Sequence, residues 1–346
     1  MKLRIMRENQ LNEDEDYSLG VSGSAGETGA LATQEGVPER LILTAPENPE
    51  RLRIDLILAH LVPQFSRARL QDWLEAGRVT ADGAAAGAKT WLKGGERIEI
   101  AAAPDPEQTA FAAEAIALDI VFEDTTILVL NKSAGLVVHP AAGNWSGTVL
   151  NGLLHHAPQL AGVPRAGIVH RLDKETTGLM VVAKTVEAQT HLVRQLQARS
   201  VTRTYLALVA GELGYAGRVD APIGRHPGHR TQMAVLREDE TGAKPAITHY
   251  APLKVYSTGT KRAASLVECR LETGRTHQIR VHMRHIGHPL VGDQVYGTLP
   301  SRGWFGRQAL HAHRLALVHP LSGVEVSFEA APPPDMDGLI KKMEQG

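Results

Sequence analysis

Cysteine and long apolar runs are nearly absent from this sequence of 346 residues. One cysteine, Cys269, excludes an intrachain disulfide and a cysteine-rich zinc site. No stretch reaches the roughly 18 consecutive apolar residues of a membrane-spanning helix, and the first residues lack the apolar core of a signal peptide. Hydrophobic residues at 43% and charged residues at 22% are ordinary globular values. We therefore expect a soluble, cytoplasmic protein without membrane contact.

An excess of either charge is also lacking, because 37 basic residues face 38 acidic ones. This balance hides an uneven distribution. Residues 1–50 carry four basic and ten acidic groups, whereas the remainder carries 33 basic and 28 acidic groups and all 16 histidines. The mildly basic body keeps nucleic acid open as a partner.

Composition divides the chain into an acidic tail and two domains, in keeping with about 150 residues per domain. Residues 1–48 are rich in Gly, Ser and acids and show no hydrophobic period, so we expect a disordered extension. A small module follows at 49–104, and a larger domain occupies 105–346. We interpret the tail as a solvating extension; the alternative is an electrostatic decoy for the basic body.

The small module combines two helical patterns with short strands. Apolar residues at helical spacing predict a helix over 51–62, and Ser66 can cap a second helix. Arg67 and Arg69 lie at the start of that second helix, where the backbone N–H groups also favour phosphate. Short strands are expected at 78–80 and 97–100.

This module resembles the S4 RNA-binding domain, which implies RNA contacts from Arg67 and Arg69. Asp82-Gly83 stands where S4 domains usually have Asn-Gly, and the insert AAAGAK is atypical. The alternative is a small helical domain with exposed arginines. The segment GAAAGAKT lacks the spacing and the preceding strand of a P-loop, which argues against a nucleoside triphosphatase. The matching residues are Arg53-Ile54-Asp55, Ser66-Arg67, Gly77-Arg78-Val79 and Gly94-Gly95-Glu96.

The larger domain mixes strand and helix patterns with short connections, which predicts an α+β or mixed-sheet fold rather than regular βαβ winding. Strands are expected at 118–122, 127–130, 136–138, 179–183, 205–209 and 266–271. Helices are expected at 148–155, 186–199, 276–286 and 337–344.

The stretch AGIVHRLDKETTGLMVVAKT at 166–185 places polar groups directly before an apolar strand. His170, Arg171 and Asp173 lie on a short turn, and Gly178 lets the backbone enter the strand. An isolated aspartate at such a place most often caps a turn or faces solvent. Beside Arg171 the carboxylate would be held ionised and oriented, which makes Asp173 a candidate for chemistry.

The motif HRLDKETTG resembles the catalytic motif of pseudouridine synthases of the RluA/RluD type. The similarity covers roughly residues 50–345 and rests on several long motifs in the same order. It implies an α+β fold with a mixed, largely antiparallel sheet, flanking helices and a central RNA cleft, preceded by the S4-like α/β domain. The motifs are LNKSAGLVVHP at 130–140, GTVLNGLLHH at 147–156, VPRAGIVHRLD at 163–173, RTYLALV at 203–209, RHPGHRTQMAV at 225–235, LETGRTHQIRVHM at 271–283 and HPLVGDQVYG at 288–297.

The resemblance implies a reaction in which the N1–C1′ bond of a uridine is cleaved, the uracil rotates, and C5 is joined to C1′. Nothing is oxidised and no group is exchanged, so neither a redox cofactor nor a metal is expected. An ionised carboxylate near the ribose is needed, and Asp173 occupies that place in the motif. It either attacks C1′ or removes the proton at C2′, and both routes stay open.

Four further residues take roles from the resemblance. Arg280 matches the arginine that pairs with the catalytic aspartate and keeps it charged, although an arginine on a helix is usually a solvated charge. Tyr205 matches the tyrosine that stacks on the target base and can assist proton removal at C5; outside the motif it would be taken as core. Ile279 matches the apolar lining of the uracil pocket, with core packing as a nearly equal alternative. Arg171 matches the arginine that holds the RNA once the nucleotide is flipped out.

A basic loop at 224–235 carries Arg225 and Arg230 together with two histidines. Such a loop is suited to gripping phosphates without reading the base sequence. Lys244 adds to the same surface. A solvated surface loop is the alternative.

The histidines at 277, 282, 285, 288, 311 and 313 suggest metal binding at first sight. His282 and His285 share a helical face, yet no His-Glu-x-x-His pattern or carboxylate set completes a site. We therefore expect no metal.

The substrate implied by the resemblance is uridine in 23S ribosomal RNA of the large subunit or its precursor, with the helix 69 stem-loop as the expected target of a monomeric enzyme. Three alternatives are a synthase for other 23S uridines, a catalytically silent ribosome-assembly factor that binds the same RNA, and a metal hydrolase.

Overall fold

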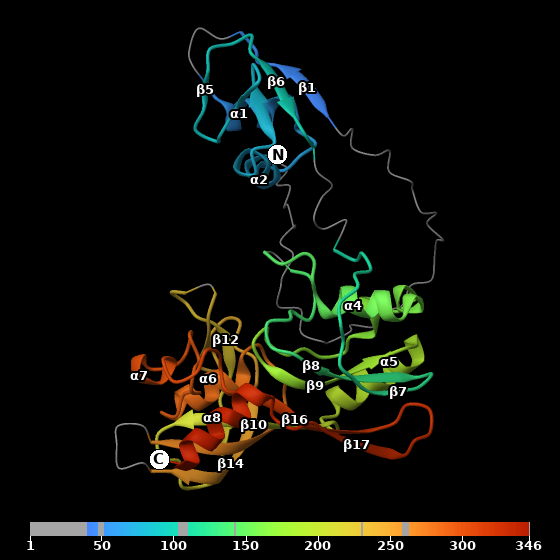
Figure 1. Cartoon of the computed structure of the whole chain (residues 1–346), viewed down its shortest axis with the longest axis vertical. Helices are drawn as coiled ribbons and strands as arrows, with labels where there is room; N and C mark the ends of the chain where they lie inside the picture. Colours follow the sequence, from blue (N-terminus) through green and yellow to red (C-terminus); the bar gives the residue numbers. More distant parts are fainter. Residues whose placement is uncertain are drawn as a thin grey trace, which may run out of the picture. The chain divides into compact units, whose positions relative to one another are not determined.

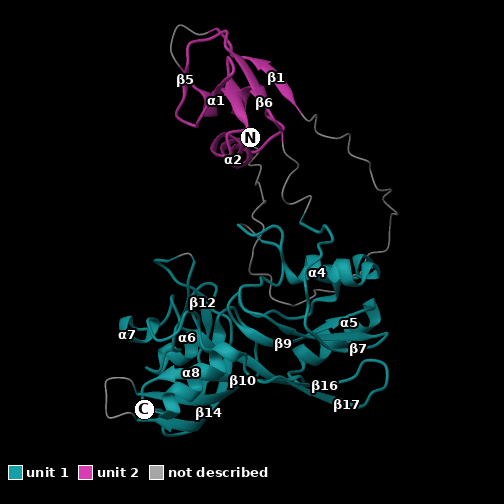
Figure 2. Cartoon of the chain, viewed as in Figure 1, with its two compact units in different colours: residues 1–21, 110–346 teal, residues 22–109 magenta. Residues whose placement is uncertain are grey.

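The computed structural model describes residues 40–47, 52–102, 110–141, 143–229, 231–257 and 263–345. They fall into two compact units, a small unit at 40–102 and a large unit at 110–345 (Figure 2). Most of the expected disordered tail, residues 1–39, lies outside the described residues, and so does Arg230.

The small unit packs two helices against a four-stranded antiparallel sheet in the order β1-β6-β3-β4, with a separate β2-β5 pair, among the residues described for it. Its elements are β1 Leu41–Thr44, β2 Leu52–Arg53, α1 Ile54–Leu61, α2 Arg67–Glu75, β3 Val79–Ala81, β4 Ala84–Ala85, β5 Trp91–Leu92 and β6 Arg97–Ile100.

Local sequence explains the turns of this unit. The Ser66 hydroxyl accepts a hydrogen bond from the backbone N–H of Arg69 at 3.3 Å and begins α2. Asp82 and Gly83 both have positive φ and form the tight turn between β3 and β4, which Asp-Gly favours. Leu41–Thr44, expected to belong to the disordered tail, instead form β1, because alternate residues of LILT pack against the core of the unit.

The large unit is built on one mixed sheet (Figure 1). Among the described residues nine strands pair in the order β11-β14-β15-β10-β16-β9-β8-β7, with β17 also paired to β16, and β16 and β9 are the parallel neighbours. The strands are β7 Ile120–Glu123, β8 Ile127–Lys132, β9 Thr177–Ala183, β10 Thr202–Ala210, β11 Gly217–Asp220, β14 Ile247–Tyr256, β15 Ala264–Leu271, β16 Leu310–Val318 and β17 Glu325–Glu329, beside a separate hairpin of β12 Ile223–Arg225 and β13 Met233–Val235.

Helices cover both faces of this sheet. Along β8, Leu128 and Leu130 join the core that contains α4 and α6, whereas Ile127 and Val129 join the core that contains α5. The β9 run TGLMVVA is buried throughout because both of its faces are covered. The helices are α4 Val149–His156, α5 Val186–Gln197, α6 Gln278–His285, α7 Leu299–Arg302 and α8 Pro334–Gln345.

The mixed α+β architecture with a large, mostly antiparallel sheet and flanking helices confirms the predicted fold class. The strand predicted at 136–138 was wrong: Val137 makes a single bridge to Thr148, with a turn before it at 134–135 and a bend after it at 138–139. Among the described residues, no helix combines the length and the apolar character needed to cross a membrane.

Candidate active site

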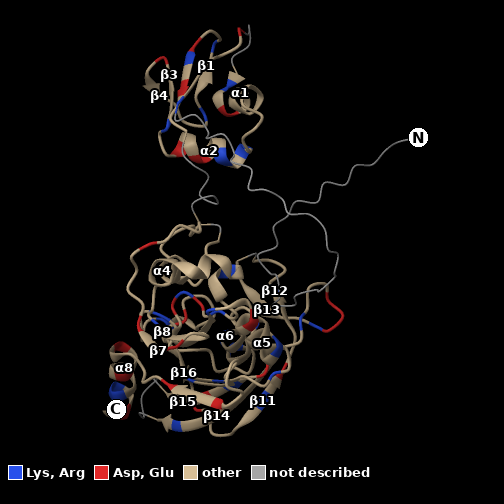
Figure 3. Cartoon of the chain, turned by 90° about the vertical axis from the view of Figure 1, so that its right-hand side faces the viewer, with Lys and Arg blue, Asp and Glu red and all other residues tan. Residues whose placement is uncertain are grey.

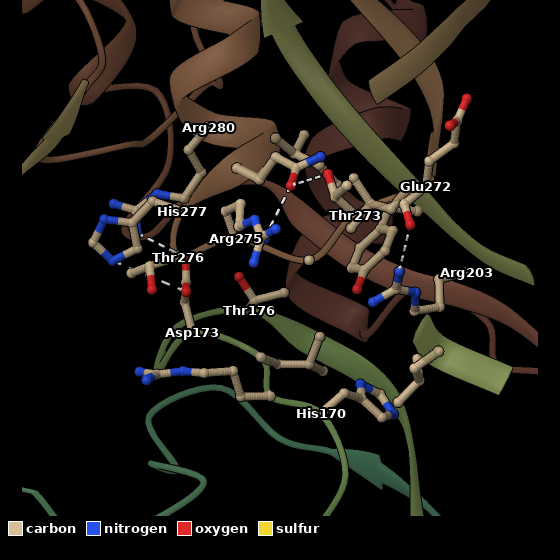
Figure 4. Close-up of a pocket in the computed structure, with 18 of the residues that line it drawn as sticks. His170, Asp173, Thr176, Arg203, Glu272, Thr273, Arg275, Thr276, His277 and Arg280 are labelled. Carbon is tan, nitrogen blue, oxygen red and sulfur yellow. Dashed lines mark hydrogen bonds and ion pairs between the residues drawn. The ribbon is translucent and has the colours of Figure 1, made fainter. Parts of the chain in front are cut away.

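A pocket of about 320 Å³ opens over the middle of the large unit's sheet (Figure 4). Its walls come from the turn before β9, from β10, from the end of α5 and from the start of α6. Strands β9, β16 and β10 are neighbours in the sheet, and this order brings the turn and β10 together. Five of the predicted catalytic and substrate-binding residues line the pocket, namely Arg171, Asp173, Tyr205, Ile279 and Arg280.

Asp173 is held by a buried arginine that it shares with a second aspartate. Arg280 Nη1 donates to Asp173 Oδ2 at 2.9 Å, and Arg280 Nε and Nη2 donate to the two oxygens of Asp293 at 2.7 and 3.0 Å. The side chains of Arg280 and Asp293 are 6% and 0% exposed, against 17% for Asp173. This chain of bonds fixes the guanidinium and leaves Asp173 Oδ1 without a hydrogen bond to Arg280.

The electrostatics of this group keep Asp173 ionised. Burial alone would raise the pKa of Asp173, but His277 and the Arg280 guanidinium outweigh burial, so that the pKa lies below its ordinary value of 3.8. Burial opposes the charge of Arg280 as well, yet Asp293 and Asp173 together raise the pKa of the guanidinium. The carboxylate is therefore charged and oriented at neutral pH.

Tyr205 and Ile279 supply the apolar part of the pocket wall. Both side chains belong to the main core of the large unit, with exposures of 6% and 3%. Burial raises the pKa of Tyr205, so its phenol stays protonated at neutral pH. Tyr205 offers a flat aromatic ring from β10, and Ile279 offers an aliphatic surface from α6.

Buried polar groups hold the turn before β9 in place. His170 Nε2 accepts a hydrogen bond from the backbone N–H of Val181 at 3.1 Å, and burial lowers the pKa of His170 to about 3. Lys132 Nζ donates to three carbonyls, including that of Lys174 at 2.9 Å. His170 and Lys132 thus anchor both sides of Asp173, while Arg171 is exposed at the pocket rim.

The start of α6 carries a second network. The Gln278 amide oxygen accepts hydrogen bonds from the Thr273 hydroxyl and the Arg275 backbone N–H. Its nitrogen donates to the Ile247 carbonyl and the Thr248 hydroxyl, so the amide is fully paired. His277 has a left-handed backbone, with φ 56° and ψ 20°. Its Nδ1 lies 2.8 Å from the Tyr296 hydroxyl, and its Nε2 lies 3.9 Å from Asp173 Oδ1.

Arg203 is a buried charge in the pocket wall with few described partners. It lies two residues before Tyr205 on β10 and is 8% exposed. Nη2 donates weakly to the Glu272 carbonyl at 3.4 Å, and Nε has no hydrogen-bond partner among the described residues. Burial lowers the pKa of Arg203, and Tyr205 opposes this shift only in part.

The remaining predicted residues lie elsewhere. Arg225 ends β12 in the β12-β13 hairpin, and Lys244 pairs its backbone with Ile223 beside that hairpin. Arg67 and Arg69 belong to the small unit, where basic residues gather at the N-terminal end of α2 and acidic ones at its C-terminal end (Figure 3). The Arg69 guanidinium lies 5.0 Å from the ring centres of two aromatic residues, Phe65 and Trp73.

Two of the histidines that suggested a metal site serve the fold. His282 bonds the Thr248 hydroxyl and the Ala221 carbonyl through its two ring nitrogens, and His311 bonds the Thr177 hydroxyl and the Ala330 carbonyl. Across the part of the chain that the structure describes, no three His, Cys, Asp or Glu side chains are grouped to hold a metal ion.

Sequence reasoning missed three pocket or support residues, Asp293, Tyr296 and Arg203, and weighed His277 only as a possible metal ligand. Alternation along the strand could have placed Arg203 on the face of Tyr205. Asp293 and Tyr296 stand inside the motif HPLVGDQVYG, but only folding brings Asp293 to Arg280. The left-handed backbone of His277 leaves no signal in a single sequence.

Comparison with known proteins assigns the chain to a protein family. Residues 126–285 match the family model described as RNA pseudouridylate synthase. The chain belongs to this family, and it is an enzyme that isomerises uridine in RNA to pseudouridine.

Its relatives include proteins named Ribosomal large subunit pseudouridine synthase D. The chain is 51% identical to that of Nitrosomonas europaea over 340 residues, which cover 96% of this chain and 95% of the relative. It is 50% identical to that of Yersinia pestis over 319 residues, covering 88% and 95%.

Among solved structures, Human RNA Pseudouridylate Synthase Domain Containing 1 aligns with a TM-score of 0.50 and 27% identity, over 68% of this chain and 97% of the human chain. Human RNA Pseudouridylate Synthase Domain Containing 4 aligns with a TM-score of 0.50 and 25% identity, over 65% and 93%.

Proposed function

We propose that this enzyme converts uridine to pseudouridine in 23S ribosomal RNA of the large subunit, with Asp173 as the catalytic carboxylate. The substrate class follows the names of the relatives. The observation that supports Asp173 most strongly is its ion pair with Arg280, itself locked by Asp293 at the wall of the pocket. The helix 69 stem-loop is the proposed target, and the cytoplasm, where the ribosome is assembled, is the proposed location of a monomeric enzyme.

In this proposal Asp173 acts through Oδ1, because Arg280 occupies Oδ2. Oδ1 either attacks C1′ or removes the proton at C2′. In both routes the N1–C1′ bond breaks and its electron pair leaves with the uracil. The base rotates and C5 bonds to C1′; the C5 proton is released to water, N1 takes up a proton, and in the second route Asp173 returns the proton to C2′. Every atom except the migrating protons stays in the product, and so the reaction needs no co-reactant.

Tyr205 and Ile279 would hold the base during its rotation. A uracil ring placed against Tyr205 meets a buried aromatic face, and stacking of this kind tolerates reorientation within the plane. Because the phenol stays protonated, Tyr205 acts as a neutral hydroxyl near C5 rather than as a phenolate. The exposed Arg171 at the rim is placed to hold the RNA strand after the nucleotide has left its stack.

Binding of the RNA backbone would extend beyond the pocket. The β12-β13 hairpin with Arg225, and Lys244 beside it, offers phosphate contacts on the large unit. We keep the S4 assignment of the small unit as a proposal, supported by its helix pair, its sheet and the arginines at the start of α2.

The experiment is a turnover assay on a 23S RNA fragment with the purified full chain. Asp173→Asn removes the charge at nearly constant size and should lower pseudouridine formation by about 10³-fold or more while RNA binding persists. Asp239→Asn, at an aspartate 77% exposed, is the matched control and should match the wild type. Turnover retained by Asp173→Asn would contradict the catalytic assignment.

A further inference from the structure

His277 is held in a backbone conformation that costs energy. Its φ of 56° lies in the left-handed region, which a non-glycine residue occupies at a cost of about 1–2 kcal/mol. It precedes the first residue of α6 and makes no side-chain capping bond to that helix. The conformation instead places the imidazole next to Asp173 and Arg280 in the pocket wall (Figure 4). Strain of this kind gathers at functional sites.

The hydrogen bonds around His277 define which ring nitrogen carries the proton. The backbone N–H of Met233 donates to the Tyr296 hydroxyl at 2.8 Å, and the same hydroxyl lies 2.8 Å from His277 Nδ1. Within the described residues the hydroxyl has no third partner. Donating its single proton to Nδ1 gives this hydroxyl a full set of partners, and we assign on that ground the neutral imidazole that carries its hydrogen on Nε2.

This hydrogen points toward the reactive oxygen without reaching it. Nε2 lies 3.9 Å from Asp173 Oδ1, which is beyond a direct hydrogen bond. A hydroxyl placed between the two atoms can accept from Nε2–H and donate to Oδ1. Both chemical routes open to Asp173 bring Oδ1 close to C1′ or C2′ of the target ribose, and the 2′-hydroxyl is the hydroxyl attached there.

We propose that His277 binds the 2′-hydroxyl of the target ribose together with Asp173 Oδ1, and so makes the pocket selective for ribonucleotides over deoxyribonucleotides. The inference rests on the proposed role of Asp173 and deepens it. Loss of one neutral hydrogen bond to substrate weakens binding by about 3- to 10-fold. The contribution of His277 should exist only for a target that carries the hydroxyl.

The test compares three enzymes, the wild type and two His277 variants, on two RNAs. Single-turnover rates are measured with excess full-length enzyme on RNA fragments whose target uridine, tritiated at C5, is either ribo or 2′-deoxy. His277→Gly removes the side chain and accepts the left-handed backbone, and His277→Asn keeps a polar group that also tolerates it. Thermal unfolding of both variants verifies that they are folded.

The ribo-to-deoxy rate ratio should fall by about 3- to 10-fold in His277→Gly, because only the ribo reaction loses a contact. If neither enzyme converts the deoxy RNA, its inhibition constant should be unchanged by His277→Gly while the ribo RNA binds more weakly. An equal loss for both RNAs would overturn the inference. Inactivity of the wild type, or activity of Asp173→Asn, on the ribo RNA would instead overturn the proposed function.

Discussion

At the scale of single residues, two buried arginines of the pocket differ in their partners. Arg280 is neutralised by two carboxylates, whereas Arg203 has a carbonyl contact and an unpaired Nε among the described residues. A buried ion pair is costly to break because the partner is left charged in a poorly solvated site. Arg280 therefore supports both the fold and the ionisation of Asp173.

Replacing Arg280 with Met should lower the free energy of unfolding by about 3–5 kcal/mol, since Asp173 and Asp293 lose their cation. The pKa of Asp173 should rise, and turnover should fall far more than RNA affinity. Arg280→Lys, which keeps the charge but not the fork, serves as the comparison. Denaturant unfolding, RNA binding and turnover are measured together. A defect confined to RNA affinity would argue against the pairing role.

His170 makes stability depend on pH. Its folded-state pKa of about 3 lies below the ordinary value of 6.5, so the unfolded chain binds the extra proton first. This contribution to stability is complete above pH 6.5 and is lost as pH falls toward 3, by at most about 1.4 kcal/mol per pH unit. His170→Gln should flatten unfolding free energy between pH 6.5 and 4, and His229→Gln, at an exposed histidine, should not. Equal pH curves for wild type and His170→Gln would refute this account.

At the scale of elements, the site depends on the close contact of β9 with β16. Gly178 has φ 113°, and a Cβ built there would collide with the backbone of Ala312. The turn that carries Asp173 runs directly into this contact.

Gly178→Ala should therefore destabilise the protein by about 3 kcal/mol or more through strain and overpacking, and should reduce turnover as the turn shifts. Gly214→Ala is the matched control, because a Cβ at that loop position has open space. Melting temperatures of the two variants that differ by less than a degree would contradict the contact.

Sequence patterns predicted the helices and strands that have strong local signals. The helix that Ser66 caps and the strand β9 were predicted because a capping residue and a continuous apolar run are visible in the local sequence. The strand at 136–138 failed because its apolar residues fill the core from an irregular turn. Five pocket residues followed from the motifs, but Asp293 and His277 depend on long-range packing and on backbone strain that no spacing reveals.

At the scale of the whole molecule, the chain combines two units with separate hydrophobic cores. The core of the small unit contains residues of that unit alone. Each unit thus has the packing needed to fold by itself. In the proposed function both units bind RNA, and linking them raises overall affinity through effective concentration.

Removing residues 1–109 should leave the large unit folded and lower the affinity for a 23S fragment at least about tenfold, with a weaker salt dependence because phosphate contacts are lost. Arg67→Gln in the full chain should reproduce a small part of this loss. Binding is measured at several salt concentrations. Unchanged affinity and salt dependence would count against RNA binding by the small unit.

The most direct measurement is pseudouridine mapping of 23S ribosomal RNA from cells that lack this protein and are supplied with the wild type, Asp173→Asn or Asp239→Asn. The account predicts that pseudouridines in the large-subunit RNA, with those of helix 69 foremost, disappear in the deletion, return with the wild type and Asp239→Asn, and stay absent with Asp173→Asn. Pseudouridines that persist in the deletion, or that return with Asp173→Asn, would contradict it.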